Sequence, residues 1–275
     1  MKRFDYKSII GHSLICEKLR QAVKTGRSVS AYLLSGAPGI GKKTVCRAFA
    51  AALLCENPLD GAACGVCESC RLLAADAHPD YIRLQLTEDK KTIGVEQVRE
   101  VLIKEASIRP FTAKRKVFVV EHAEAMTVQA QNALLKVLEE PPAYAVFILL
   151  AESKEKLLDT VLSRTLKLQL LPLSAPLCEE YFNNRGEDDS SRAMFAARFC
   201  QGILGRGEKI LTDEAYYELY KNSVHELFGM LKSPATLTDA QRFLTEQKDN
   251  IFDVIDFWFL FLRDCLRITS PAKAK

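Results

Sequence analysis

The sequence predicts an α/β fold built on a five-stranded parallel sheet, followed by a helical part. Up to about residue 170, strand-like segments alternate with helical ones, and several strands are apolar throughout, which is typical of a sheet covered on both faces. The stretch SGAPGIGKKTV at 35–45 joins the first strand to a helix, which is the context of a phosphate-binding loop. After Pro172 the pattern contains only helical segments and polar loops.

Each predicted element rests on its own pattern of apolar residues. Helices are expected where apolar positions recur at helical spacing, at 13–25, 44–55, 94–106, 127–140 and 156–164. Strands are expected where short runs are apolar throughout or alternate with polar residues, at 31–35, 81–86, the start of 116–126, 145–151 and 166–171. Thr127 is the expected N-cap of its helix, and Pro141-Pro142 is the expected stop.

Composition narrows the class of protein. The formal net charge of +3 is close to balance, so composition alone implies no polyanionic partner. No apolar run is long enough to span a bilayer, and the N-terminus lacks the apolar region of a secretory signal. The sequence therefore predicts a cytoplasmic protein without a membrane partner. In that compartment nine cysteines indicate thiols or a metal site, not a disulfide framework.

The glycine-rich stretch nearly matches the phosphate-loop pattern G-x-x-x-x-G-K-[ST]. Gly36, Gly41 and Lys42 fit it, but Lys43 stands where a Ser or Thr hydroxyl would coordinate Mg²⁺. An ammonium repels the cation, and Thr44 cannot replace the hydroxyl because one helical step rotates a side chain by about 100°. The pattern favours a phosphate loop that has lost Mg²⁺-dependent hydrolysis. It leaves open whether nucleotide binds weakly, and a simple glycine turn is the alternative.

Four cysteines form a cluster in the sequence. Cys55, Cys64, Cys67 and Cys70 give the spacing C-x8-C-x2-C-x2-C in a short segment poor in core residues. Thiolates at this spacing can surround one tetrahedral ion, so we expect a closed, structural zinc site. An iron–sulfur cluster and four free thiols are the alternatives. The remaining cysteines are expected to be small core residues: Cys16, Cys46, Cys178, Cys200 and Cys265.

The order of the motifs resembles a known family. GAPGIGK is followed by the four cysteines, then by KVFVVEHAEAMTVQAQNALLKVLEEPP and TVLSRT. This order resembles the clamp-loader ATPase family of the AAA+ class, and within it the delta-prime subunits of bacterial DNA polymerase III. The likeness is dense over about residues 5–170. It is weaker at 198–211, which resembles a lid helix, and at 257–268, which resembles a collar helix.

The resemblance implies an architecture and a set of partners. It implies an AAA+ domain at 1–170 with strand order 5-1-4-3-2 and a zinc knuckle at 55–70. A helical lid is expected at 171–212, followed by a helical collar at 213–275 that is short or truncated. The implied partners are the gamma/tau and delta subunits and, through the assembled complex, the sliding clamp and primer-template DNA. The implied cofactor is structural zinc, with ATP and Mg²⁺ bound weakly or not at all. The implied setting is the DNA polymerase III holoenzyme in the bacterial cytoplasm.

The resemblance also assigns roles to residues. Delta-prime members do not hydrolyse ATP but project an arginine from a Ser-Arg-Cys motif into a neighbour's ATP site. Here the motif reads Ser163-Arg164-Thr165, so Arg164 is the expected arginine finger, acting in trans. The vestigial nucleotide site is expected to comprise Gly36, Gly39, Gly41, Lys42, Lys43, Thr44 and Glu121.

Several departures from the motor ATPases support an inactive site. Motors carry two carboxylates after the third strand, whereas this chain has Glu121 followed by His122, which is expected to be structural. They carry Thr or Asn after the fourth strand, where Ala151-Glu152 stands. They carry an Arg after a Gly in the lid, where Gly205 stands and Arg206 is one residue off.

Two other functions remain open from the sequence. One is an active, gamma/tau-like motor of the same loader, against which Lys43 and His122 speak. The other is a zinc-bearing nucleic-acid binder, against which the cysteine segment speaks because it lacks interleaved aromatic and basic residues.

Overall fold

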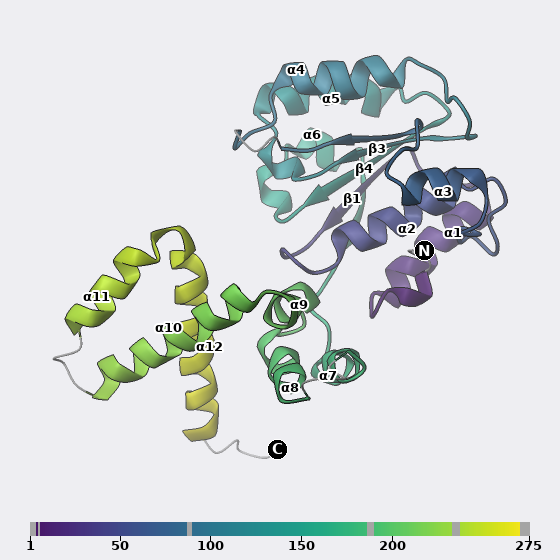
Figure 1. Cartoon of the computed structure of the whole chain (residues 1–275). Coiled ribbons are helices and arrows are strands. Elements are labelled where there is room, and N and C mark those ends of the chain that lie inside the picture. The colour runs from purple at the N-terminus through teal and green to yellow at the C-terminus, as the bar shows by residue number, and fades with distance from the viewer. Residues whose placement is uncertain (1–3, 5, 87–89, 186–189, 233–236, 270–275) are drawn as a thin grey trace. The chain divides into compact units, whose positions relative to one another are not determined.

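The computed structural model describes residues 4, 6–86, 90–185, 190–232 and 237–269 (Figure 1). It divides into two compact units, Met1–Leu177 and Cys178–Lys275. The expected end of the collar at 270–275 lies outside the described residues.

The first unit is built on one five-stranded sheet. Its strands are β1 Ala31–Ser35, β2 Tyr81–Leu84, β3 Lys116–Val120, β4 Ala145–Ala151 and β5 Leu166–Gln169. All pairs are parallel, and the order is β2-β3-β4-β1-β5. The predicted fold class and the strand order 5-1-4-3-2 are therefore confirmed.

Register brings the carboxyl ends of three central strands to one edge. Ser35 of β1 pairs with Ala151 of β4, and Val120 of β3 pairs with Leu149 of β4. Every residue of these three strands is buried, and the stacked rings of Phe118 and Phe147 lie 4.8 Å apart between β3 and β4. The segments that leave this edge carry the candidate site.

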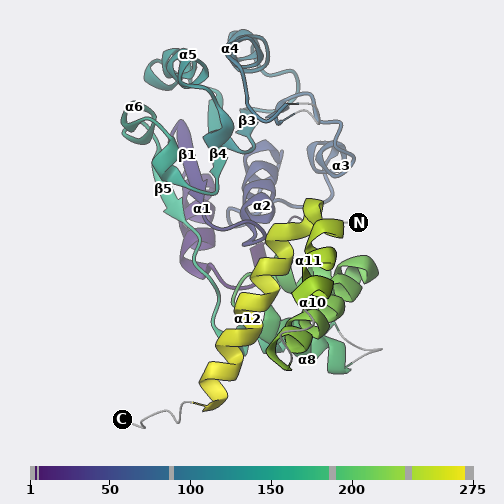
Figure 2. The ribbon, with the colours of Figure 1, turned by 90° about the vertical axis from the view of Figure 1, so that its left-hand side faces the viewer.

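Helices cover both faces of the sheet (Figures 1 and 2). One face carries α1 Ser13–Lys24 and α2 Lys42–Leu54, with α3 Glu68–Ala74 packed on α2. The other carries α4 Val95–Gln97, its continuation as a π-helix at Val98–Lys104, α5 Val128–Glu139 and α6 Asp159–Leu162. Single 3₁₀ turns lie at Tyr6–Ser8, Ala123–Ala125 and Lys154–Lys156.

The helices of this unit largely match the prediction, with differences at their ends. Thr127 caps α5 as expected, because its side chain accepts the N–H of Ala130. By contrast, α2 begins at Lys42 instead of residue 44, and α6 is shorter than the expected 156–164. The sequence analysis missed α3, since its seven residues follow Cys67 inside the cysteine segment.

Asp80 anchors the loop before β3. It is 0% exposed, and its carboxylate accepts the N–H groups of Phe111, Thr112 and Ala113 at 2.7–2.9 Å. Burial by itself would raise the pKa of Asp80, but these donors outweigh burial, so the pKa lies below its ordinary value.

We expect Asp80→Asn to lower the free energy of unfolding by about 2–3 kcal/mol, because an amide cannot accept all of these bonds. Since the pKa is lowered on folding, the carboxylate stabilises the protein above the unfolded value of about 3.9 and loses this effect as pH falls through the folded value. Urea unfolding at pH 7 and at acidic pH measures both effects. The exposed Asp159→Asn is the control. Equal stability of Asp80→Asn and the wild type at pH 7 would remove Asp80 from this role.

The second unit is helical in its described part. Its helices are α7 Ala175–Asn183, which crosses the division, α8 Ser190–Phe199, α9 Leu204–Thr212, α10 Glu214–Lys232, α11 Leu237–Glu246 and α12 Ile251–Thr269, with a 3₁₀ turn at Lys248–Asn250. Helix α10 packs against α9, α11 and α12.

The helix expected at 198–211 is instead two helices, because Gln201 and Gly202 adopt positive φ between α8 and α9. The segment 257–268 is helical as expected. No helix in the described residues is long and apolar enough to cross a membrane.

Candidate functional site

The glycine loop between β1 and α2 has the backbone shape that requires glycine. Gly39 and Gly41 adopt φ values of 77° and 105°, which side-chain-bearing residues rarely occupy. A Cβ at Gly36 would lie 2.7 Å from the carbonyl oxygen of Leu170. The strand–loop–helix geometry of a phosphate loop is therefore present.

Lys42 turns back onto the loop. Its Nζ donates to the carbonyl oxygens of Gly36 at 2.6 Å and Ala37 at 3.0 Å. Burial lowers the pKa of Lys42, while the nearby carboxylates of Glu152 and Glu124 oppose that shift. The lysine of the phosphate-loop pattern is thus engaged with its own loop.

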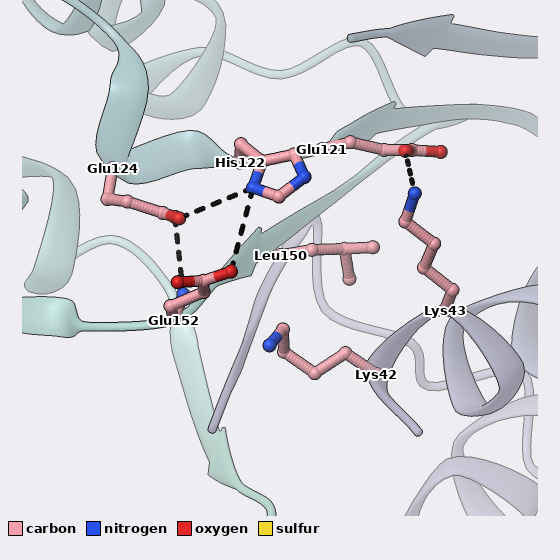
Figure 3. Close-up of a pocket in the computed structure, with 7 residues that line it drawn as sticks. All are labelled: Lys42, Lys43, Glu121, His122, Glu124, Leu150 and Glu152. Carbon is pink, nitrogen blue, oxygen red and sulfur yellow. Dashed lines mark hydrogen bonds and ion pairs between the residues drawn. The ribbon is translucent and has the colours of Figure 1, made fainter. Parts of the chain in front are cut away.

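Lys43 stands at the position where the phosphate-loop pattern has a hydroxyl that coordinates Mg²⁺. Its Nζ lies 2.6 Å from Oε2 of Glu121, which is almost fully buried at the end of β3 (Figure 3). The ammonium therefore pairs with Glu121, another residue of the expected vestigial nucleotide site. These residues do not fit Mg²⁺, because an ammonium stands in place of an oxygen ligand.

A cavity of about 300 Å³ lies over the loop, at the low end of the size of ligand pockets. It is lined by Pro38, Gly39, Gly41, Lys42, Lys43, Thr44, His122 and Glu152. Thr44 thus borders the cavity, although one helical step separates it from the position of the missing hydroxyl.

His122 lies beside two carboxylates. Its Nδ1 is 3.5 Å from Oε1 of Glu124 and 3.9 Å from Oε1 of Glu152, and the backbone N–H of Glu152 donates to Oε2 of Glu124 (Figure 3). These residues line a small cavity of about 20 Å³ together with Lys42, Lys43, Glu121 and Leu150. Glu124 could not be singled out from the sequence, where its only signal is its place in the acidic stretch after β3.

The four clustered cysteines converge as predicted. All four Sγ atoms lie within 4.8 Å of one another, and Cys55 Sγ is 3.8 Å from Cys67 Sγ. This equals the edge of about 3.8 Å expected for tetrahedral thiolates with Zn–S bonds of about 2.3 Å. The N–H of Cys64 donates to Cys55 Sγ, and that of Cys67 donates to Cys64 Sγ. The cluster fits a four-thiolate metal site, and zinc could bind there.

Arg164 lies just after α6, remote in sequence from the glycine loop. Its Nη1 donates to the carbonyl oxygen of Thr160 at 2.9 Å, and its Nη2 is 2.7 Å from Oε1 of Glu139. The side chain is 35% exposed. Arg206, which is one residue away from the lid position where motors carry an arginine, lies in α9. Its Nη2 is 3.6 Å from Oδ2 of Asp256.

Comparisons with solved structures place the fold. A point variant of RuvB from Thermotoga maritima aligns with a TM-score of 0.51 at 14% identity, over 81% of this chain and 66% of that chain. RuvB of the same organism, described as a Holliday junction branch migration motor, aligns with a TM-score of 0.50 at the same identity, over 80% and 65%. At this identity the likeness shows only that the chain shares the fold of these proteins.

Comparisons of sequence place the family. Residues 11–174 match the family described as DNA polymerase III, delta subunit. The chain is 45% identical over 146 residues to DNA polymerase III subunit delta' of Pseudomonas aeruginosa, covering 52% of this chain and 43% of the relative. It is 39% identical over 165 residues to subunit delta' of Escherichia coli, covering 60% and 48%.

The gamma/tau subunits are also related. Subunit tau/gamma of Haemophilus influenzae is 30% identical over 236 residues, covering 82% of this chain and 33% of the relative. The chain thus spans less than half the length of these curated relatives. The family match covers more than half of the chain, and the chain therefore belongs to the delta-prime subunits of DNA polymerase III, within the clamp-loader family.

Proposed function

We propose that this chain acts in the clamp loader as a subunit that does not hydrolyse ATP and helps to load the sliding clamp onto primed DNA. The observation that carries the proposal is the 2.6 Å ion pair between Lys43 and Glu121. In an active phosphate-loop ATPase, a hydroxyl and a carboxylate at these two positions hold Mg²⁺. Here the two side chains bind each other instead.

The second half of a hydrolytic site is also altered. His122 follows Glu121 where motors have a carboxylate that activates water, and its Nδ1 faces Glu124 and Glu152. Lys42 is held by loop carbonyls. We therefore assign Gly36, Gly39, Gly41, Lys42, Lys43, Thr44 and Glu121 to a vestigial nucleotide site without hydrolytic activity.

The chain's catalytic contribution is Arg164, acting on the ATP of a neighbouring motor subunit. An arginine supplied in trans stabilises the charge that develops on the transferring phosphoryl group. In the isolated chain its guanidinium is partly exposed and paired with Glu139. An exposed ion pair of this kind contributes about 0–1 kcal/mol, so a phosphate of the partner can replace Glu139 at low cost.

The second unit supplies contacts to the other subunits. Exposed apolar side chains recur along α12 with alternating steps of three and four residues, which defines a stripe made of Phe252, Ile255, Phe259, Leu262 and Leu266. A stripe at this spacing is the seam of helix–helix packing. It supports a collar at 213–275 that joins the gamma/tau and delta subunits, with 171–212 as the lid. DNA and the sliding clamp are contacted through the assembled complex.

Zinc is the proposed structural cofactor, held by Cys55, Cys64, Cys67 and Cys70. The four thiolates fill a tetrahedral shell and leave no position open for water. The ion therefore clips the end of α2 to the start of α3 and takes no part in chemistry.

Steady-state turnover tests the inactive nucleotide site. We expect no Mg²⁺-dependent ATP hydrolysis by the purified chain, with or without DNA. We expect Lys43→Thr to strengthen Mg²⁺-dependent nucleotide binding, because it frees Glu121 and restores a hydroxyl, while hydrolysis stays absent since His122 is unchanged. Fluorescent-nucleotide titration and phosphate release measure the two effects.

Lys42→Ala in the Lys43→Thr background is the control for binding through the loop. The alternative of a gamma/tau-like motor would be supported instead if the wild-type chain hydrolysed ATP and Lys42→Ala abolished that turnover. Salt-sensitive DNA binding by the isolated chain would favour a nucleic-acid binder.

A further inference from the structure

The cluster of His122, Glu124 and Glu152 has no part in the proposed function. His122 and Glu124 come from the segment after β3, and Glu152 follows β4 directly. One side-chain donor atom from each residue can be chosen so that all three lie within 4.8 Å of one another (Figure 3). Parallel pairing of β3 and β4 brings these segments to the same edge of the sheet.

The cluster contains two carboxylates that form no salt bridge with a Lys or Arg in the described part of the chain. Glu124 has a side chain only 10% exposed, yet no Lys or Arg in the described part of the chain forms a salt bridge with it. The Lys42 ammonium interacts electrostatically with both carboxylates, but its hydrogen bonds go to carbonyl oxygens of the loop. Lys43 pairs with Glu121. A cation bound between the two carboxylates would add to the compensation that Lys42 gives them.

The space between these groups suits one small ion. These three residues line a cavity of about 20 Å³, close to the volume of a single water molecule, together with Lys42, Lys43, Glu121 and Leu150. First-row metals bind imidazole nitrogen and carboxylate oxygen at about 2.0–2.2 Å, which sets adjacent ligand atoms about 3.0–3.5 Å apart. The 3.5 and 3.9 Å separations from His122 Nδ1 are within about half an ångström of that range.

We propose that His122, Glu124 and Glu152 bind one divalent transition-metal ion, separate from the four-cysteine site. One imidazole and two carboxylates favour Mn²⁺, Fe²⁺, Co²⁺ or Zn²⁺ over thiolate-seeking ions, and the imidazole disfavours Mg²⁺. Three protein ligands leave positions for water. His122 and Glu152 also line the larger cavity over the glycine loop, so an ion bound by them would border that cavity. The proposal goes beyond the clamp-loader role and does not depend on it.

Mn²⁺ alone is the probe, because it prefers oxygen and nitrogen ligands and leaves zinc in the four-cysteine site. The full chain, carrying its zinc, is titrated with MnCl₂ without nucleotide, and free Mn²⁺ is followed by electron paramagnetic resonance. We expect one Mn²⁺ per chain, with hyperfine coupling to an imidazole nitrogen. His122→Ala and Glu152→Gln are each expected to weaken binding by about tenfold or more, a loss of at least about 1.4 kcal/mol.

Glu155→Gln is the matched control, since Glu155 lies in the same segment but accepts from Ser153 Oγ. It is expected to bind Mn²⁺ as the wild type does. Circular dichroism checks that each variant is folded, and the nitrogen coupling in the wild type does not depend on any variant. Absence of Mn²⁺ binding at millimolar concentration overturns the proposal. Binding without nitrogen coupling, or equal binding by His122→Ala, also overturns it.

Discussion

Arg164→Ala is expected to leave assembly of the clamp loader intact and, if Arg164 is the proposed arginine finger, to abolish ATP hydrolysis at the neighbouring site that it completes. Arginine fingers supplied in trans contribute about 10³–10⁵-fold to turnover. Hydrolysis at the loader's other sites continues, so total turnover falls only by the share of the affected site. Single-turnover phosphate release from the reconstituted loader, with clamp and primed DNA, separates that share from the rest.

Three variants make this test specific. Arg99→Ala removes an exposed arginine that pairs with Glu96 within its own helix, and it is expected to have no effect. Glu139→Gln releases the guanidinium from its ion pair and is expected to preserve hydrolysis. Arg164→Lys keeps a charge but not the planar fork, so it should resemble Arg164→Ala. Unchanged phosphate release in Arg164→Ala would remove this residue from the mechanism.

The sheet and the glycine loop could be predicted because their signals are local. β3 and β4 are apolar at nearly every position, which marks strands covered on both faces. Thr127 followed by a helical apolar pattern fixed the start of α5. The cysteine spacing similarly specified a cluster whose four sulfur atoms meet in the structure.

Other features depend on contacts that no local pattern encodes. The pairing of Lys43 with Glu121 joins the start of α2 to the end of β3 and depends on their three-dimensional register. Glu124 is recognisable as a site residue only in the structure, where Glu152 follows β4 and its backbone N–H donates to the Glu124 carboxylate. The π geometry at Val98–Lys104 is absent from the expected helix at 94–106 because apolar periodicity does not distinguish hydrogen-bonding patterns.

The same edge of the sheet explains how the loop holds its shape without the ligands of an active ATPase. Buried strand residues and the positive-φ glycines fix the positions of the loop whatever side chains follow them. Lys43 then neutralises Glu121, and Lys42 is satisfied by the carbonyls of Gly36 and Ala37. Each lysine thus binds a group of the protein, so the loop does not require nucleotide to satisfy these charges.

Removal of zinc is expected to unfold the cysteine segment and to lower the stability of the first unit by several kcal/mol. Structural zinc contributes apparent binding free energies of about 10–16 kcal/mol in zinc-finger peptides, comparable to the whole stability of a domain. Here the sheet is an independent core, so the loss is expected to be concentrated at 55–74 and the end of α2. Cys67→Ser, or chelation of the wild type, should produce it, measured by thermal unfolding and by hydrogen exchange along the chain.

The metal itself is checked by elemental analysis, which should give about one zinc per wild-type chain for a four-thiolate site and none for Cys67→Ser. Cys265→Ser in α12 is the control cysteine, and it is expected to retain zinc and the protection of 55–74. Iron in place of zinc would instead identify an iron–sulfur cluster, while a metal-free protein with full protection would show that packing alone holds the segment. Hydrogen exchange can locate the effect because Cys55 directly follows α2 and Cys70 lies within α3. The proposed ion would join these two helices through their sulfur atoms, so its loss should increase exchange in both.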